Sequence, residues 1–360
     1  MDNYSILIPS YTVGCDAYRQ IPKYCSLYGH KAVVIGGQRA MQAARAKLLA
    51  ATKGSSVQIT GFFLYGTDAT YEAADALCVL PKVREADMIF AVGGGKAVDT
   101  CKLVAIKLEK PFFTFPTIAS NCAAASSLAI VYNTDGSFCD FVHYLDTARH
   151  VFIDTEIIAG APSEYLWAGI GDTYAKYYEV SLSARGEKLP HYLATGVHMS
   201  RMCMETLVEH GEQALADNRA GTQSSALRDC ALAIIITTGW VSMLVARDHN
   251  MDYNGGVAHA FFYSLCELPG FEETHIHGVV VGFGVLLQLL IDGQTDEFDK
   301  LYAFNRRIGL PVSLDEIGVS LQDVKKVAER LVHDEDLDHF PYRLTAGQII
   351  EAAEKLEHTR

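Results

Sequence analysis

The sequence predicts a protein of two domains: an α/β domain over residues 1–157, built on a parallel sheet, and an all-α domain over residues 158–360. Over about the first 155 residues, short β-rich runs alternate with helical stretches, which is typical of parallel βαβ units. From Pro162 to the end, the apolar residues recur at helical spacing instead. The length of 360 residues also exceeds the usual size of one domain.

The first domain is expected to alternate strands and helices. The expected strands cover residues 31–35, 57–63, 87–92 and 112–115, and the expected helices cover 38–51, 70–84 and the stretch that ends at Leu108. Residues 128–132 and 138–144 flank the turn sequence Asn133-Thr134-Asp135-Gly136, which indicates a hairpin. A short strand at 151–154 completes this domain.

Composition limits the classes of function. The formal net charge of -13 disfavours nucleic-acid binding, because neutralising phosphates requires a basic surface. Nine cysteines without a CxxC pair indicate reduced thiols, and residues 1–10 lack the basic segment of a secretory signal, so we expect a cytoplasmic protein. The longest apolar stretch, 231–246, is shorter than the ~18–20 residues of a membrane span, so we expect a buried helix and no membrane partner.

A glycine run, Gly93-Gly94-Gly95-Lys96, follows one expected strand and opens the next helix. This layout lets a backbone approach a pyrophosphate closely and points helix N–H groups at its charge. The spacing GxxxxGK[ST] is absent, which disfavours a P-loop that hydrolyses nucleotides. Asp99 lies in the first helical turn, where a carboxylate also suits the helix dipole. The alternative is a tight turn without a ligand.

Two further patterns indicate binding chemistry. After the strand that ends at Pro116, hydroxyl and small residues run to Ser127, which suits either a cofactor loop or a plain surface connection. In the helical half, Asp172, His259 and His277 stand among apolar neighbours, where such groups are costly unless they are paired or bind a metal. Each could be a satisfied core residue, and spacing alone does not show that the three converge.

Five motifs in family order, GGGKAVDTCK, FPTIASNCAAASSLAIVYNTDG, AGIGDTYAKYYE, AHAFF and HGVVVGFG, resemble the iron-containing (group III) alcohol dehydrogenase and glycerol dehydrogenase family over essentially the whole chain. The resemblance implies an N-terminal dinucleotide-binding α/β domain, an all-α C-terminal domain, a dehydroquinate synthase-like fold and a homo-oligomer. It implies metal ligands at Asp172, His259 and His277. His275 lies two residues from His277 and so points elsewhere on a helix or turn, which leaves it a role only as an indirect or substrate contact or as a proton relay. It also implies pyrophosphate contacts at Gly94, Gly95, Lys96 and Asp99, and nicotinamide-cofactor contacts at Thr117, Ser120, Ser126, Leu128 and Tyr132.

Two departures from the family pattern bear on specificity. Glycerol dehydrogenases carry an Asp that contacts the polyol where this chain has Cys122, and a neutral thiol does not repel a carboxylate substrate. The Asn-Cys-Ala-Ala pattern together with Gly-Ile-Gly-Asp-Thr more closely resembles a hydroxycarboxylate, or 2-oxo acid, dehydrogenase branch. After the first expected strand, Gly37 and Arg39 stand where NAD-preferring members usually place an Asp, and an arginine can meet a 2′-phosphate. This predicts NADP(H) over NAD(H), unless Arg39 is only a solvated residue.

The sequence therefore predicts a metal-dependent, NAD(P)(H)-linked oxidoreductase that interconverts a small carbonyl and alcohol, with 2-oxo and 2-hydroxy acids favoured. Zinc and iron both fit one carboxylate and two imidazoles. One alternative is a glycerol or 1,2-diol dehydrogenase that uses NAD, and another is a non-catalytic nucleotide-binding protein. A dehydroquinate synthase-type lyase would need a Lys and Arg cluster for a phosphate, and none surrounds residues 259–278.

Overall fold

The computed structural model describes residues 5–143, 146–246 and 253–359. The chain divides into two compact units, Met1–Pro162 with Asp217–Met243, and Ser163–Ala216 with Leu244–Arg360. The boundary expected between residues 157 and 158 stays a prediction. The helical pattern after Pro162 gave no indication that residues 217–243 return to the first unit.

The first unit contains a parallel sheet of six strands in the order β1-β8-β5-β4-β2-β3. The strands are β1 (Ser10–Gly14), β2 (Lys31–Gly36), β3 (Gln58–Leu64), β4 (Met88–Gly93), β5 (Phe112–Pro116) and β8 (His150–Asp154). The parallel α/β fold is confirmed, and five strands lie where the sequence predicts them. We did not predict β1, which is an edge strand with two exposed residues and so lacks a continuous apolar run.

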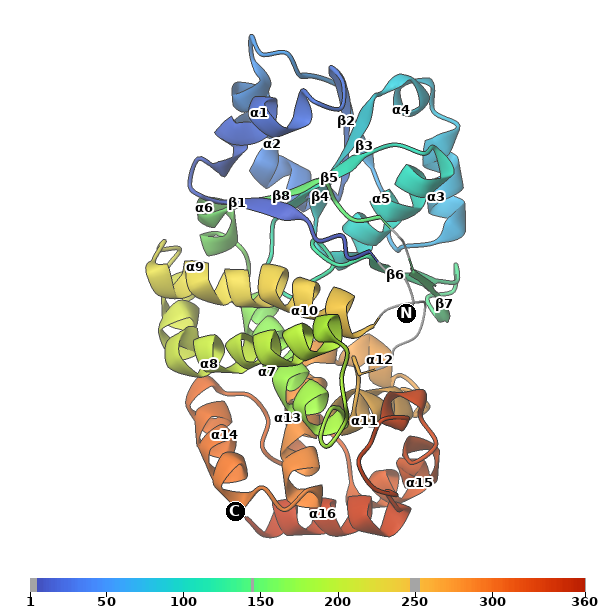
Figure 1. Cartoon of the computed structure of the whole chain (residues 1–360), viewed down its shortest axis with the longest axis vertical. Coiled ribbons are helices and arrows are strands. Elements are labelled where there is room, and N and C mark those ends of the chain that lie inside the picture. The colour runs from blue at the N-terminus through green and yellow to red at the C-terminus, as the bar shows by residue number, and fades with distance from the viewer. Residues whose placement is uncertain (1–4, 144–145, 247–252, 360) are drawn as a thin grey trace. The chain divides into compact units, whose positions relative to one another are not determined.

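Helices cover both faces of this sheet (Figure 1). Along β2, Ala32 and Val34 pack towards one set of helices, and Val33 and Ile35 pack towards the other, because side chains alternate along a strand. The first set is η1 (Ala17–Gln20), α1 (Ile21–Cys25) and α2 (Gln38–Thr52); the second is α3 (Tyr71–Cys78), α4 (Pro81–Glu85) and α5 (Gly95–Lys107). The single helix expected over 70–84 is wrong, because Pro81 starts a new helix and leaves Leu80 extended.

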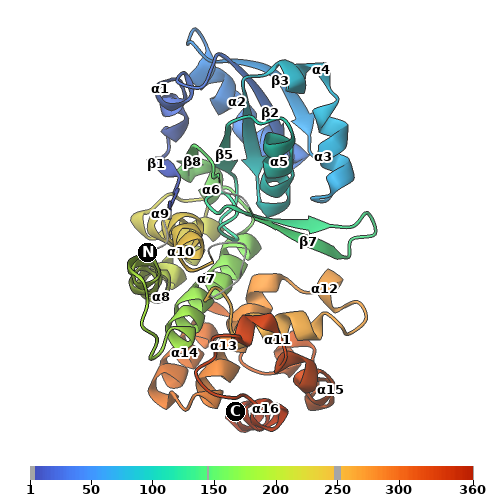
Figure 2. The same ribbon diagram turned by 45° about the vertical axis from the view of Figure 1, so that its right-hand side comes forward.

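The expected hairpin is present as β6 (Leu128–Tyr132) and β7 (Phe138–His143), which pair antiparallel and project from the first unit as an arm (Figure 2). The Asn133 N–H and C=O groups close the turn against Ser137 and Gly136. Position 144 of the expected strand lies outside the described residues. The short helix α6 (Thr155–Ala159) follows β8, and the Asp154 carboxylate caps it by accepting two backbone N–H bonds.

The segment 217–243 carries one long apolar helical run. The segment comprises the end of α8 (His191–Arg219), then α9 (Ser225–Leu232), a π-helical turn η2 (Ala233–Thr237) and most of α10 (Thr238–Val245). The apolar stretch expected at 231–246 overlaps a helical run over Ser225–Val245 that is long and apolar enough to cross a membrane. Of an apolar 18-residue window in that run, 61% is buried inside the protein. Such burial is typical of a core helix.

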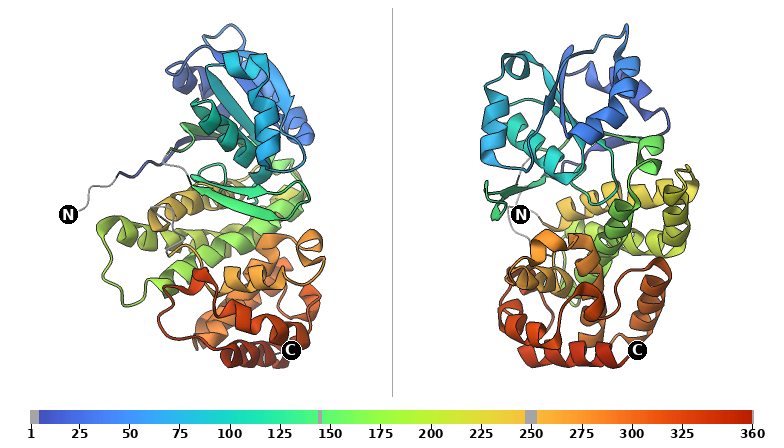
Figure 3. Two further views of the ribbon diagram at one scale, coloured as in Figure 1. Left: turned by 90° about the vertical axis from the view of Figure 1, so that its right-hand side faces the viewer. Right: turned by 180° about the vertical axis from the view of Figure 1, so that it is seen from behind.

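The second unit is helical, as predicted. It contains most of α8 together with α7 (Ser163–Ser183), α11 (Val257–Leu265), α12 (Phe271–Thr274), α13 (His277–Ile291), α14 (Thr295–Ile308), η3 (Asp315–Ile317), α15 (Leu321–Leu331), η4 (Glu335–Leu337) and α16 (Ala346–His358). Figure 3 shows these helices from two further sides. Helix α13 is buried on all sides from Gly278 to Leu289 and packs against α7, α11, α14 and α16, so it forms the centre of the unit.

Candidate functional site

Glycines bring the helices α7, α11 and α13 into backbone contact. A Cβ added at Gly278 of α13 would lie 2.3 Å from the Ala168 carbonyl oxygen of α7. On another side of α13, a Cβ at Gly284 would lie 2.8 Å from the Ala258 Cα of α11. Real side chains do not fit at such distances, so the motifs AGIGD and HGVVVGFG place helix axes unusually close together.

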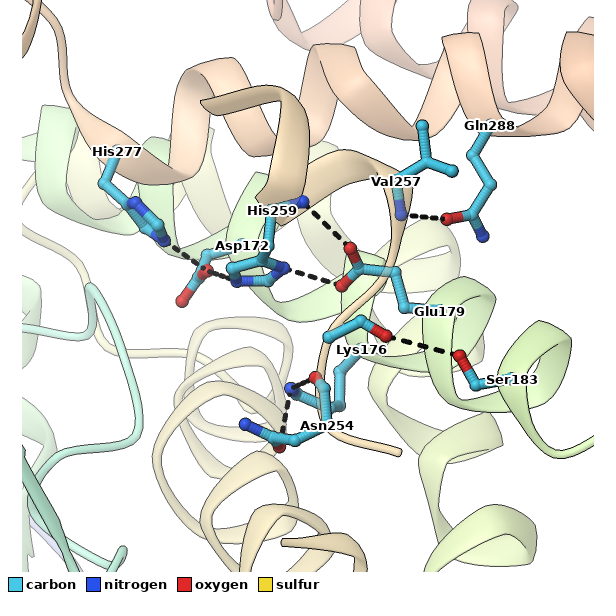
Figure 4. Close-up of polar contacts among 10 residues, drawn as sticks. Asp172, Lys176, Glu179, Ser183, Asn254, Val257, His259, His277 and Gln288 are labelled. Carbon is cyan, nitrogen blue, oxygen red and sulfur yellow. Dashed lines mark hydrogen bonds and ion pairs between the residues drawn. The ribbon is translucent and has the colours of Figure 1, made fainter. Parts of the chain in front are cut away.

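This packing gathers Asp172 of α7, His259 of α11 and His277 of α13 (Figure 4). The Asp172 Oδ1 atom lies 3.6 Å from His259 Nε2 and 3.4 Å from His277 Nε2. The ligand atoms of all three residues lie within 4.8 Å of one another. The Asp172 and His259 side chains are mostly buried, whereas the His277 side chain is 39% exposed.

The cluster fits a divalent metal ion. The two distances from Asp172 Oδ1 are long for hydrogen bonds. They match the separation of about 3.4 Å between ligands that lie about 2.1 Å from a tetrahedral metal. One carboxylate oxygen and two imidazole nitrogens also leave coordination positions open, which is typical of a catalytic site rather than a structural one. Zinc and ferrous iron both suit this donor set.

Electrostatics at the cluster favour positive charge. Burial alone would raise the pKa of the Asp172 carboxyl, but His259 and His277 hold that pKa well below its usual range. For His259, burial alone would lower the pKa. Glu179 and Asp172 raise it by more than burial lowers it, so the pKa of His259 is about 10. The same two carboxylates that attract a proton to His259 would attract a metal cation in its place.

Sequence reasoning missed a buried polar network around the cluster. Lys176 and Glu179 lie on the same face of α7 as Asp172, one and two turns further along, respectively. The Glu179 carboxylate accepts hydrogen bonds from His259, and Lys176 Nζ donates to the backbone and side-chain oxygens of Asn254 (Figure 4). Charged residues at helical spacing within an otherwise buried helix were the available signal.

His275 lies outside the cluster. Its ring stacks on Phe271 at 3.9 Å between centroids, its Nδ1 lies 2.8 Å from the Phe271 carbonyl oxygen, and its Nε2 lies 3.1 Å from the Ile317 carbonyl oxygen. Both ring nitrogens thus face backbone carbonyl oxygens rather than the cluster. The predicted relay or substrate role of His275 has no support in this geometry, and the residue instead connects the α12 segment to η3.

In the first unit, the glycine turn forms the start of α5. Gly93 has a φ of 148°, which L side chains rarely adopt, and α5 begins at Gly95 with no side chain capping its N-terminal N–H groups. A Cβ at Gly94 would lie 2.6 Å from Ile118, and one at Gly95 would lie 2.9 Å from Asn121. The glycine turn therefore packs directly against the loop that follows β5.

Lys96 and Asp99 make contacts within the first unit. Lys96 Nζ lies 2.7 Å from Asp68 Oδ2 and 5.1 Å from the centre of the Tyr132 ring. Asp99 is buried and pairs with Lys102, which also donates to the Leu128 carbonyl oxygen at the start of β6. Asp99 and Lys102 thereby anchor the hairpin arm to α5. We did not predict the part played by Lys102.

The remaining predicted cofactor and substrate positions lie in the loop after β5 and at the start of α2. The Thr117 N–H donates to the Gly93 carbonyl oxygen, and the N–H groups of Ala125 and Ser126 donate to the Cys122 carbonyl oxygen, so Cys122 begins a tight turn. Thr117 and Ser126 are buried, whereas Ser120 and Cys122 are partly exposed. At the end of β2, Gly37 caps α2 and Arg39 is exposed in its first turn.

Comparisons with known proteins agree with this picture. A family model described as "Iron-containing alcohol dehydrogenase" matches residues 9–155. Hydroxycarboxylate dehydrogenase A of Escherichia coli (strain K12) is 32% identical over 334 residues, which are 91% of this chain and 89% of that protein. Glycerol dehydrogenase of Thermotoga maritima is 33% identical over 290 residues, 77% of this chain and 75% of that protein. The crystal structure of glycerol dehydrogenase from Schizosaccharomyces pombe superposes with a TM-score of 0.86 at 24% identity, covering 99% of this chain and 91% of that one.

Proposed function

Because the chain belongs to the iron-containing alcohol dehydrogenase family and is an oxidoreductase of alcohols and carbonyls, we propose that its substrates are 2-oxo acids and the corresponding 2-hydroxy acids. It uses a nicotinamide dinucleotide and one divalent metal. We further propose that the dinucleotide is NADP(H), and that the protein is a cytoplasmic homo-oligomer.

The observation that carries the reaction chemistry is the convergence of Asp172, His259 and His277. These three residues would hold the metal, which supplies a Lewis acid that polarises the substrate oxygen and stabilises negative charge developing on it. The Asp172 carboxylate supplies a negative charge, and the two imidazoles supply neutral nitrogen donors. His277 is the most exposed of the three, so the substrate would approach from its side.

The dinucleotide would bind to the first unit through backbone groups. The uncapped N–H groups at the start of α5, with Gly94 and Gly95, suit a pyrophosphate. Lys96 adds a positive charge beside this turn, although Asp68 partly neutralises it. Thr117, Ser120, Ser126, Leu128 and Tyr132 are proposed to line the remainder of the dinucleotide site. Asp99 would act there only indirectly, by holding the hairpin arm in place.

Cys122 supports the 2-oxo acid over a polyol. Its side chain is neutral and partly exposed at the start of a turn in the loop that packs on the glycine turn. A carboxylate substrate would meet no like charge from this position, whereas an aspartate there would repel it. The identity to hydroxycarboxylate dehydrogenase A, over 91% of the chain, agrees with this assignment.

A substrate panel tests the proposal. With metal restored after chelation, we expect NADPH-dependent reduction of 2-oxobutanoate to exceed, in kcat/KM, NADPH-dependent reduction of dihydroxyacetone and hydroxyacetone, the carbonyl partners of the diols glycerol and 1,2-propanediol. Cys122→Asp should lower kcat/KM for 2-oxobutanoate by about 10- to 100-fold, through like-charge repulsion in a partly exposed site. Cys122→Ser, which stays neutral, should keep 2-oxobutanoate ahead of the carbonyl partners of the diols. A higher kcat/KM for those carbonyl partners in the unchanged protein would overturn the proposal.

A glycerol or 1,2-diol dehydrogenase that uses NAD is the second candidate. The observation in its favour is the glycerol dehydrogenase of Thermotoga maritima, which is 33% identical over 77% of this chain. The same panel separates the two candidates, because glycerol has no carboxylate for a neutral Cys122 to accommodate.

A further inference from the structure

Glu179 directs both of its carboxylate oxygens at one residue, His259. Its side chain is fully buried on α7. Oε1 accepts a hydrogen bond of 2.9 Å from the His259 backbone N–H, and Oε2 lies 2.7 Å from His259 Nδ1 (Figure 4). The carboxylate therefore holds the backbone and the ring of the same residue at once.

The His259 backbone N–H needs an acceptor because it lies in the first turn of α11. Gly256 precedes this helix and has no side chain to cap it, so the first N–H groups of α11 need partners from elsewhere. Gln288 Oε1 of α13 accepts from the Val257 N–H, and Glu179 of α7 accepts from the His259 N–H. A carboxylate is also the favourable group at this end of a helix, because it meets the positive end of the helix dipole.

The ring contact selects a tautomer of His259. A carboxylate only accepts hydrogen bonds, so Nδ1 carries a proton, and in the neutral ring that binds a metal the lone pair is therefore on Nε2. That Nε2 is the atom that faces Asp172. His277 differs: its ring stands edge-on against Phe262 with centroids 4.4 Å apart, and among the described residues no hydrogen bond reaches its Nδ1.

We propose that Glu179 is a positioning residue that fixes the tautomer and the ring orientation of His259, so that Nε2 is presented to the divalent metal. The inference rests on the proposed function, because it takes Asp172, His259 and His277 as the metal ligands. On this inference, the orientation of the His259 ring is fixed before a metal binds, whereas the His277 ring can turn when the metal binds.

Glu179→Gln is the decisive variant, since an amide has only one accepting oxygen. If that oxygen caps the His259 N–H, the NH2 group faces Nδ1 and favours the tautomer with its proton on Nε2. We expect Zn²⁺ affinity, measured by competition with a chromophoric chelator, to fall by about 10- to 100-fold. The visible absorption spectrum of the Co²⁺-loaded protein should change as well. Glu179→Asp, which keeps the charge, should recover part of the affinity.

Gln288→Met provides the matched control. It removes the other cap at the same helix start and is of similar size, but it leaves the His259 ring untouched. We expect this variant to lower the free energy of unfolding while keeping the Zn²⁺ affinity within about twofold of the unchanged protein. A general loosening of α11 would instead weaken metal binding in both variants.

Four outcomes would overturn the inference. Glu179→Gln could bind Zn²⁺ as tightly as the unchanged protein with the same Co²⁺ spectrum, or Gln288→Met could lose as much affinity as Glu179→Gln. In both cases the metal centre of the proposed function would stand. If the unchanged protein binds no Zn²⁺, or if Asp172→Asn does not weaken its binding, then the metal centre fails together with the role of Glu179.

Discussion

Gly171 and Gly278 lie so close that a Cβ added to Gly171 would stand 2.2 Å from the Gly278 carbonyl oxygen. Each glycine is next to a candidate metal ligand in the sequence. Gly171 directly precedes Asp172, and Gly278 directly follows His277. The close approach of these two backbones thus sets how near Asp172 can come to His277. The glycines beside the ligands are part of the construction of the site.

Gly278→Ala should disrupt this construction. Its methyl group would lie 2.3 Å from the Ala168 carbonyl oxygen and 2.8 Å from Asp172 Cβ, so α7 and α13 would have to move apart. We expect a loss of about 1–3 kcal/mol in the free energy of unfolding, as for other overpacked cores, and weaker Zn²⁺ binding. Urea denaturation and chelator competition measure the two effects.

Gly347→Ala is the control for that substitution. Gly347 lies exposed in the first turn of α16, and the nearest atom to an added Cβ is Thr345 Oγ1 at 3.9 Å. We expect no loss of stability, or a gain of about 0.4–1 kcal/mol, because alanine restricts the unfolded chain more than glycine does. Equal losses in the two variants would show that Gly278 has no special packing role.

Arg39→Ala tests the proposed preference for NADP(H). Arg39 is exposed in the first turn of α2, directly after β2, and no acidic residue stands at the end of this strand. We expect the KM for NADPH to rise by about tenfold and the KM for NADH to change little, because only NADPH carries the 2′-phosphate that an arginine can bind.

Arg45→Ala is the matched control for Arg39→Ala. It removes an exposed arginine from the same helix, but the Arg45 guanidinium lies over the Phe62 ring, 4.0 Å from its centre. We expect it to leave the ratio of the two KM values unchanged. If Arg39→Ala also leaves that ratio unchanged, Arg39 is only a solvated residue and the preference for NADP(H) loses its basis.

Asp336 should make the stability of the protein depend on pH. It is almost fully buried, its Oδ2 atom has no hydrogen-bond partner, and burial is the main cause that raises its pKa to about 7. Among the neighbouring charges, Glu179 and Asp334 raise this pKa further, while His259 and Lys176 lower it. A carboxyl group with a raised pKa holds its proton in the folded protein, so it contributes stability at low pH that is lost as pH rises through about 7.

Asp336→Asn mimics the protonated form and should remove that dependence. With metal removed by chelation, we expect the variant to be more stable than the unchanged protein at pH 8, by at most about 4 kcal/mol, and nearly equal to it at about pH 4. Urea denaturation at both values measures this. Asp338→Asn, at an exposed position of the same turn, should have no comparable effect. An Asp336→Asn variant that is no more stable at pH 8 would contradict the expectation.

Much of the fold could be predicted because local patterns encode it. The buried strands β2, β4 and β5 read as apolar runs, and the glycine turn after β4 marks the start of α5. The edge strand β1 could not be found in this way, because its only strand partner among the described residues is β8, at the far end of the chain segment that forms the sheet. The return of residues 217–243 to the first unit was also hidden, since a helical pattern does not say which surface the helix packs against.

The sequence by itself determined the chemistry available to this protein: one carboxylate and two imidazoles in apolar surroundings, a glycine turn before a helix, and a neutral thiol in place of an acid. Only the tertiary structure decided which of these groups meet. Asp172, His259 and His277 converge because glycines on α7 and α13 let the backbones touch, whereas His275, two residues from His277, faces two backbone carbonyls. The contact of Glu179 with His259 likewise depends on α7 and α11 lying side by side. Side-chain type is local information, but the distances that make a site are set by the packing of segments far apart in the chain.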